Sequence, residues 1–234
     1  MNTFVQRFAQ LVLPWLTLGT MLAALYLVFI YVPTDKAQGI IQRIFYFHVP
    51  LAIMTYVAFT TVAVASAIFL WNGSHTSDRI AYASAEVGLL ICTAMLTTGP
   101  IWAKPIWGTW WTWDARLTTT LILWLIYAAY LMLRMVAEPG EQSARYAAIL
   151  GIIGIADIPI IRYSVYWWRT IHPVVITTRE GGTGLADPRM QVTLLVCFLA
   201  FFFLFLWLLW VRAKDLELHE RVEALRQEAL AHAP

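Results

Sequence analysis

Residues 102–118 read WAKPIWGTWWTWDARLT, and a long apolar run follows directly. We call residues 102–118 the tryptophan-rich connector; it contains five indoles and closes with Asp114 and Arg116. Read as a helix, Trp107, Trp110, Trp111 and Asp114 fall at i, i+3, i+4 and i+7, which is one face. We expect a flat aromatic surface with a carboxylate at its edge, suited to a large planar ligand with a charged rim.

A membrane belt is the alternative interpretation of these tryptophans. Tryptophan is enriched at both membrane–water interfaces, where its ring lies at headgroup depth and its N–H is wetted. The helical spacing, together with the added Asp and Arg, favours a binding surface over a belt.

The composition is that of an integral membrane protein. Of the 234 residues 60% are hydrophobic and only 13% are charged, and the mean hydropathy is +0.67. A soluble domain is about half apolar and about a quarter charged. The net charge of +2, without a basic run, gives no indication of nucleic-acid binding. The sequence has no Cys-x-x-Cys-His motif, so the chain is not itself a c-type cytochrome, and no Cys/His pattern typical of zinc sites occurs.

The fold class predicted is an all-α integral membrane protein with six transmembrane helices. Runs of about 20 apolar residues are long enough to cross a bilayer. The predicted spans are residues 11–32, 51–71, 80–101, 117–136, 144–161 and 191–211. The tryptophan-rich connector lies between the third and fourth. Residues 1–211 are expected to form the membrane domain, and residues 212–234, which alternate acids and bases, a charged helical tail.

Six spans place both termini on one side of the membrane and three notable connectors on the other. His48 precedes the second predicted span and His172 lies between the fifth and sixth, so both share a membrane face with the tryptophan-rich connector. His75, His219 and His232 fall on the opposite side. The sixteen lysines and arginines divide evenly between the two sides, so the positive-inside rule does not decide the orientation.

Two carboxylates lie inside predicted spans. A carboxylate in a span is costly and often functional, but Glu86 is close enough to a span end to reach water. Asp157 is expected to pair with Arg162 or Arg169 near the interface.

Haem is a ligand consistent with these parts. Its macrocycle stacks on tryptophan, its iron accepts neutral imidazole nitrogens, and its propionates bind Arg or Lys. Pro50 follows His48 by two residues, and Pro173 directly follows His172. Both histidines lie at the edge of an apolar segment. A single interfacial histidine is more often a hydrogen-bonded structural residue, and this alternative stays open from the residues alone.

Residues 107–118, WGTWWTWDARLT, resemble the tryptophan-rich "WWD" signature of the haem-handling proteins of cytochrome c maturation. With the chain length, the six spans and the flanking histidines, the resemblance extends over essentially the whole chain to the CcmC family. It implies non-covalently bound haem b at the periplasmic face of the bacterial inner membrane, with both termini cytoplasmic. It implies His48 and His172 as axial ligands of the iron. The implied haem platform comprises Trp102, Trp107, Trp110, Trp111, Trp113, Asp114 and Arg116.

The resemblance also implies partners. The family presents haem to a periplasmic haem chaperone, CcmE, and works with the ATP-binding cassette pair CcmA and CcmB and the small subunit CcmD in the lipid bilayer. No ATP-binding motif occurs in this chain, which we expect to be an assembly factor that promotes haem attachment to the chaperone. We take the following as candidate partners of the propionates: Lys36, Arg43, Arg116, Arg162, Arg169 and Arg179.

Two other functions compete with this hypothesis. A haem exporter would need a polar or cavity-lined path through the spans, and Glu86 contributes little to such a path. A quinol-reactive haem subunit of a respiratory complex usually carries its ligating histidines inside spans, whereas His48 and His172 lie at predicted span edges.

Overall fold

The computed structural model describes residues 3–137, 140–168, 185 and 187–231, which form helices joined by short connections and no β-sheet. The elements are α1 (Thr3–Leu11), α2 (Leu13–Tyr26), a π-helical segment (Leu27–Tyr31), a 3₁₀ helix (Ile40–Ile44), α3 (Phe45–Asn72), α4 (His75–Trp107), α5 (Ala115–Val136), α6 (Glu141–Ile155), α7 (Asp157–Trp167) and α8 (Pro188–Ala231).

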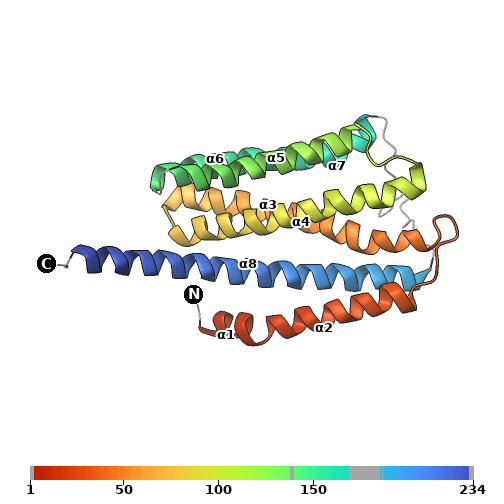
Figure 1. The fold of residues 1–234 in the computed structure, drawn as a ribbon, viewed down its shortest axis with the longest axis horizontal. Coiled ribbons are helices and arrows are strands. Elements are labelled where there is room, and N and C mark those ends of the chain that lie inside the picture. The colour runs from red at the N-terminus through yellow and green to blue at the C-terminus, as the bar shows by residue number, and fades with distance from the viewer. Residues whose placement is uncertain (1–2, 138–139, 169–184, 186, 232–234) are drawn as a thin grey trace.

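Six stretches of the described chain are long and apolar enough to cross a membrane, which confirms the predicted fold class. They are α2 with its π-helical end, the 3₁₀ helix with α3, α4, α5, α6 with α7, and α8. Figure 1 shows the helices side by side, with the N- and C-terminal ends of the chain at one end of the bundle and the α4–α5 connection at the other.

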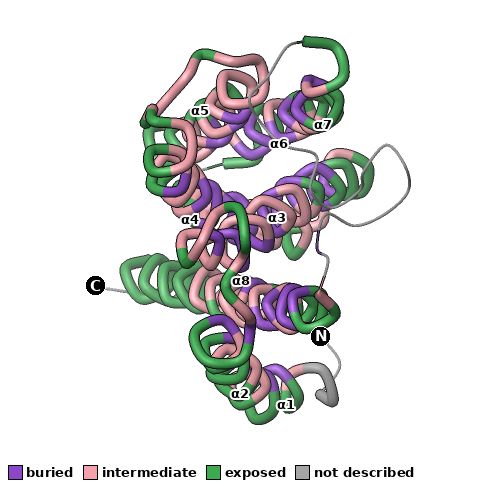
Figure 2. The backbone as a smooth tube through the Cα atoms, turned by 90° about the vertical axis from the view of Figure 1, so that its right-hand side faces the viewer, coloured by how far each residue is buried: buried purple, intermediate pink, exposed green. Residues whose placement is uncertain are grey.

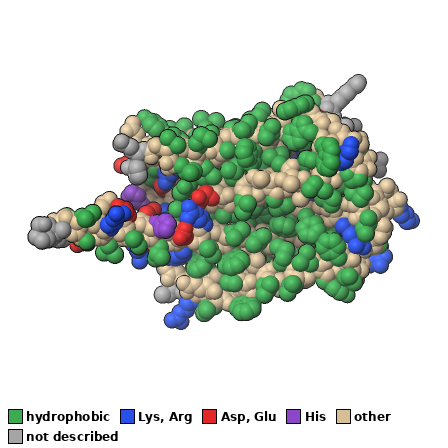
Figure 3. Space-filling view, viewed as in Figure 1, with side chains coloured by type: hydrophobic (Ala, Val, Ile, Leu, Met, Phe, Trp, Pro, Cys, Tyr) green, Lys and Arg blue, Asp and Glu red, His purple; other side chains and the backbone are tan. Residues whose placement is uncertain are grey.

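The bundle is layered around the α3–α4 hairpin. α8 packs against α3 and α4 and carries α2 on its other side, while α5, α6 and α7 cover the opposite side of the hairpin. In the end-on view of Figure 2 the buried residues lie along the contacts between these layers and the exposed ones on the outside. Hydrophobic side chains cover most of the visible outer face, and charged side chains gather toward its two ends (Figure 3).

The centre of the bundle is closely packed. A Cβ placed on Gly88 of α4 would lie 2.9 Å from the Cβ of Ala58 and 2.9 Å from Cε1 of Phe59, both on α3. The Phe59 ring stacks on Tyr127 of α5 at 3.6 Å between centroids and 2° between planes. The Tyr127 hydroxyl donates to the carbonyl of Gly151, 2.9 Å away. Aromatic faces and small residues thus fill the middle of the membrane domain.

The observed helices differ from the predicted spans mainly at the end that carries the connectors. α3 begins at Phe45, so His48 lies in its first turn and not in the connector before it. Phe45 and Tyr46 are buried, and this packing extends the helix ahead of the purely apolar run. α4 continues to Trp107, beyond the predicted end at residue 101, because Trp102 is buried against Phe45.

The fifth span is interrupted. α6 ends at Ile155 and α7 begins at Asp157, with Ala156 between them. Pro159 lies in the first turn of α7, where its missing N–H costs no intrahelical hydrogen bond. The expected pairing of Asp157 with Arg162 is wrong: Asp157 is buried, and among the described residues its carboxylate makes no ion pair and its Oδ2 has no hydrogen-bond partner. Arg169 lies outside the described residues.

The end of the bundle that carries the termini is held by ion pairs between distant helices. Glu86 of α4 accepts from the Nε and Nη2 of Arg212 at 2.5 and 2.9 Å, and Asp78 binds Arg134 of α5 in the same two-pronged way at 3.0 and 2.8 Å. α8 runs without a break from the membrane domain into the charged tail. Glu86 is therefore a structural carboxylate that joins α4 to the start of that tail.

Replacing Gly88 by Ala should destabilise the protein, because the added methyl group meets the Ala58 Cβ, which cannot move away as a flexible side chain would. Overpacking of this kind costs about 1–3 kcal/mol. Gly19→Ala in α2 is the matched control, since nothing lies within 4 Å of its added Cβ. Thermal unfolding of the detergent-solubilised variants should show a lowered midpoint for Gly88→Ala alone; equal midpoints would mean that the α3–α4 contact is loose.

Candidate functional site

The tryptophan-rich connector is not helical over its centre, so the single helical face predicted for Trp107, Trp110, Trp111 and Asp114 is wrong. α4 ends because Gly108 adopts a left-handed backbone, with φ of 75°, and its N–H donates to the carbonyl of Lys104. The residues between Gly108 and Asp114 are irregular, and α5 begins at Ala115.

Asp114 starts α5 as its N-cap. Its Oδ1 accepts from the Leu117 N–H at 3.0 Å, and its Oδ2 accepts from the Thr112 hydroxyl at 3.2 Å. A carboxylate at this position satisfies an N–H that has no partner within the helix. The aspartate of the signature therefore fixes the turn that carries the indoles. It does not line the cavity that lies beside the connector.

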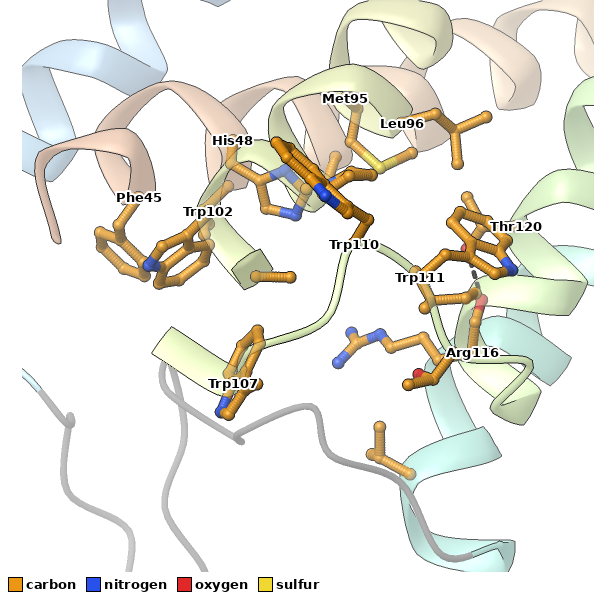
Figure 4. A pocket seen from close by; sticks show the side chains of 18 of the residues that line it. Phe45, His48, Met95, Leu96, Trp102, Trp107, Trp110, Trp111, Arg116 and Thr120 are labelled. Carbon is orange, nitrogen blue, oxygen red and sulfur yellow. Dashed lines mark hydrogen bonds between the residues drawn. The ribbon is translucent and has the colours of Figure 1, made fainter. Parts of the chain in front are cut away.

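The connector closes one side of a cavity of about 320 Å³, at the low end of the range typical of small-molecule sites. The other walls come from α3, α4, α5 and α7 at the same end of the bundle, and Figure 4 shows the labelled side chains converging on this space. The residues that line it include His48, Tyr56, Gly99, Trp102, Trp107, Trp110, Trp111, Arg116 and Arg162.

Four of the five connector tryptophans line the cavity, but each in a different setting. Trp102 is 6% exposed, and its Nε1 donates to the Gln38 side chain at 3.0 Å. Trp110 is 57% exposed at the surface. The Nε1 of Trp111 is buried and has no hydrogen-bond partner among the described residues. Trp113 is 76% exposed and packs edge-on against Trp111, outside the cavity.

The His48 ring enters the cavity wall from α3 and is held by α4. Its Nδ1 lies 3.0 Å from the Thr98 hydroxyl, and its ring lies edge-on to Trp102 with 5.8 Å between centroids. Gly99 faces the same ring, since a Cβ there would lie 3.3 Å from the His48 Cε1. The imidazole predicted from the sequence is thus beside the tryptophans, as the hypothesis requires.

Two of the predicted cations reach the cavity. Arg116 and Arg162 both line it, as does Tyr56. Arg43 instead donates to the carbonyl of Phe29 at 3.0 Å, outside the lining. Lys36 is exposed and also lies outside it.

Three predicted site residues, His172, Arg169 and Arg179, lie outside the described residues. The structure adds residues that the sequence analysis missed. Tyr56 follows His48 by two helical turns on one face of α3, a spacing that is visible in the sequence once the helix start is known.

These features define a multi-pass α-helical membrane protein with a cavity at one end of its helix bundle, walled by tryptophan and lined by an imidazole and two arginines. The chain belongs to the heme exporter protein C (CcmC) family, whose sequence model matches residues 1–228. The resemblance expected from the WWD signature is confirmed.

Related proteins match most of the chain. Heme exporter protein C of Bradyrhizobium diazoefficiens is 36% identical over 219 residues, covering 92% of this chain and 82% of its own. Heme exporter protein C of Haemophilus influenzae is 37% identical over 199 residues, covering 85% and 78%. A putative cytochrome c biosynthesis ccmC-like mitochondrial protein of Marchantia polymorpha is 38% identical over 199 residues, covering 85% and 83%.

Replacing Asp114 by Ala should lower the free energy of unfolding by about 1 kcal/mol, the usual cost of losing an N-cap side chain. Asp114→Asn keeps an oxygen that accepts from the Leu117 N–H and should cost less. Thermal unfolding of the two variants in detergent measures the difference. If Ala and Asn are equally stable, the cap contributes nothing and the aspartate acts through another contact.

Proposed function

We propose that the protein binds haem at the periplasmic face of the bacterial inner membrane and delivers it to the haem chaperone CcmE during c-type cytochrome biogenesis. The observation that carries the proposal is the meeting of His48, four tryptophans and two arginines at one cavity. Membership in the heme exporter protein C family supports a role in haem handling for cytochrome c maturation.

The side chains present fit non-covalent haem b. Indole rings offer apolar surfaces to a macrocycle, and a neutral imidazole is an iron ligand. The buried Trp111 Nε1 is an N–H donor with no acceptor in the described part of the chain, so a carboxylate or other acceptor on a ligand in the cavity would satisfy it. We propose His48 and His172 as the two axial ligands, and Trp102, Trp107, Trp110 and Trp111 as the platform.

The charge at this end of the bundle suits the two propionates. Arg116 and Arg162 line the cavity, and a guanidinium binds a carboxylate with two parallel hydrogen bonds. Two described acids at this end are engaged: Asp114 caps α5, and hydrogen bonding to the Arg189 side chain holds the pKa of the Asp187 carboxyl below its usual value. Positive charge therefore remains for an anionic ligand. We keep Lys36, Arg43, Arg169 and Arg179 as secondary candidates.

Transfer to a partner requires that the site be reachable from outside the membrane. Trp110 and Trp113 are more than half exposed on the irregular part of the connector. This arrangement supports a site that a chaperone histidine approaches at the membrane surface. CcmA, CcmB and CcmD remain proposed partners of the same assembly.

Passage of haem through the bundle, the first rival function, finds little support in the described core. Toward the other face, the cavity gives way to the Gly88–Ala58 contact and the Phe59–Tyr127 stack, which leave no room for a macrocycle without separating α3 from its neighbours. We therefore favour loading at one face over transport across the bilayer.

His48→Ala and His172→Ala should each abolish the low-spin spectrum of haem that we expect in the purified wild-type protein, because each removes one axial imidazole. Optical absorption of the detergent-purified proteins, produced in haem-sufficient cells, measures this. His75→Ala, at the opposite end of the bundle, is the control and should leave the spectrum unchanged. A wild type without haem, or variants with wild-type spectra, would contradict the ligand assignment.

Arg116→Gln should weaken haem binding by roughly tenfold to a hundredfold, because a hydrogen bond to a charged group contributes about 1.5–3 kcal/mol. The penalty should vanish for haem dimethyl ester, whose propionates carry no charge. Titration of the apoprotein with both compounds tests this, and Arg145→Gln, exposed at the other end of the bundle, serves as the control. An equal penalty for the ester would show that Arg116 acts on the fold and not on propionate.

A further inference from the structure

The contacts of Thr98 bear on which nitrogen of His48 carries the proton. A threonine hydroxyl has one proton to donate and two lone pairs that accept. The Thr98 Oγ1 lies 2.9 Å from the carbonyl oxygen of Ala94 and 3.1 Å from that of Met95. Carbonyl oxygens only accept, so both of these contacts require the Thr98 proton.

The same hydroxyl lies 3.0 Å from the Nδ1 of His48. The hydroxyl also has lone pairs, either of which can accept an N–H from Nδ1. In a neutral imidazole whose single N–H is at Nδ1, Nε2 carries the lone pair that a metal ligand needs.

We propose that Thr98 is a positioning residue that holds His48 in the Nδ1–H tautomer and so makes Nε2 the nitrogen that binds haem iron. The inference rests on the proposed function, in which His48 is an axial ligand. Metal-binding histidines commonly donate their second N–H to a fixed acceptor, which sets the ring orientation and raises the basicity of the ligating nitrogen.

Two neighbours of Thr98 on α4 complete the cradle. Gly99 lets the ring approach the helix, since a Cβ there would lie 3.3 Å from the His48 Cε1 and 3.9 Å from its Nδ1. Trp102, one turn after Thr98, contacts the ring edge-on. The acceptor, the space and the aromatic wall therefore come from a short stretch of one helix, which fixes both the tilt and the tautomer of the imidazole.

The first experiment reads the tautomer without haem. The ¹⁵N NMR spectrum of the histidine-labelled apoprotein in detergent, with the His48 signals assigned by their loss in His48→Ala, distinguishes Nδ1–H from Nε2–H. We expect Nδ1–H in the wild type and in Thr98→Ser, which keeps the hydroxyl. Thr98→Val, of nearly the same shape but without an acceptor, should shift the population toward Nε2–H. A wild type in the Nε2–H form overturns the proposal.

The second experiment reads the consequence on bound haem. Thr98→Val should lower haem affinity by about tenfold or more and raise the reduction potential of the bound haem, because a less basic imidazole stabilises ferric iron less. Thr98→Ser should restore both values. If the wild type binds haem and Thr98→Val has the same haem affinity and the same reduction potential, the positioning role is wrong. If the wild type takes up no haem, the proposed function is wrong. The NMR spectra of the apoprotein then still test the tautomer of His48, because they need no haem.

Discussion

The close approach of α3 and α4 is the contact on which the rest of the structure depends. Inside a bilayer apolar surfaces gain little by leaving lipid, so helices associate where small residues let their backbones approach. Gly88 lies against Ala58, and ten residues further along each helix, in opposite directions, Thr98 lies against His48. Because the helices are antiparallel, one register sets both contacts. The packing at the bundle centre therefore also places the imidazole against its acceptor about 15 Å away.

The second constraint is the pair of helix ends that bracket the irregular part of the connector. The left-handed Gly108 stops α4 and the Asp114 cap starts α5, so the intervening indoles follow a turn that no helix could provide. Trp102 and Trp107 reach the cavity from the end of α4, and Trp110 and Trp111 reach it from the turn. Indoles supplied in this way surround a space, whereas a single helical face would have offered a flat surface.

The two ends of the bundle use charge differently. At the end with the termini, acids and bases form pairs between helices, as Glu86 does with Arg212 and Asp78 with Arg134, and these pairs tie α4, α5 and the tail-bearing α8 together. At the cavity end, Asp114 caps α5 and Asp187 pairs with Arg189, while Arg116 and Arg162 line the cavity. The first arrangement stabilises the fold, and the second leaves positive charge for a ligand.

The sequence by itself determined the membrane class, the six spans and the family, because apolar run length and a short tryptophan motif are local properties. It left open the contacts that depend on the register between packed helices and the positions at which helices begin and end. Gly108 is a typical helix-ending residue, but the helical spacing of the tryptophans indicated that the helix continued through it. Only the tertiary structure placed Thr98 against His48, and Arg212 against Glu86 across 126 residues, since such pairings follow from how helices pack and not from their periodicity.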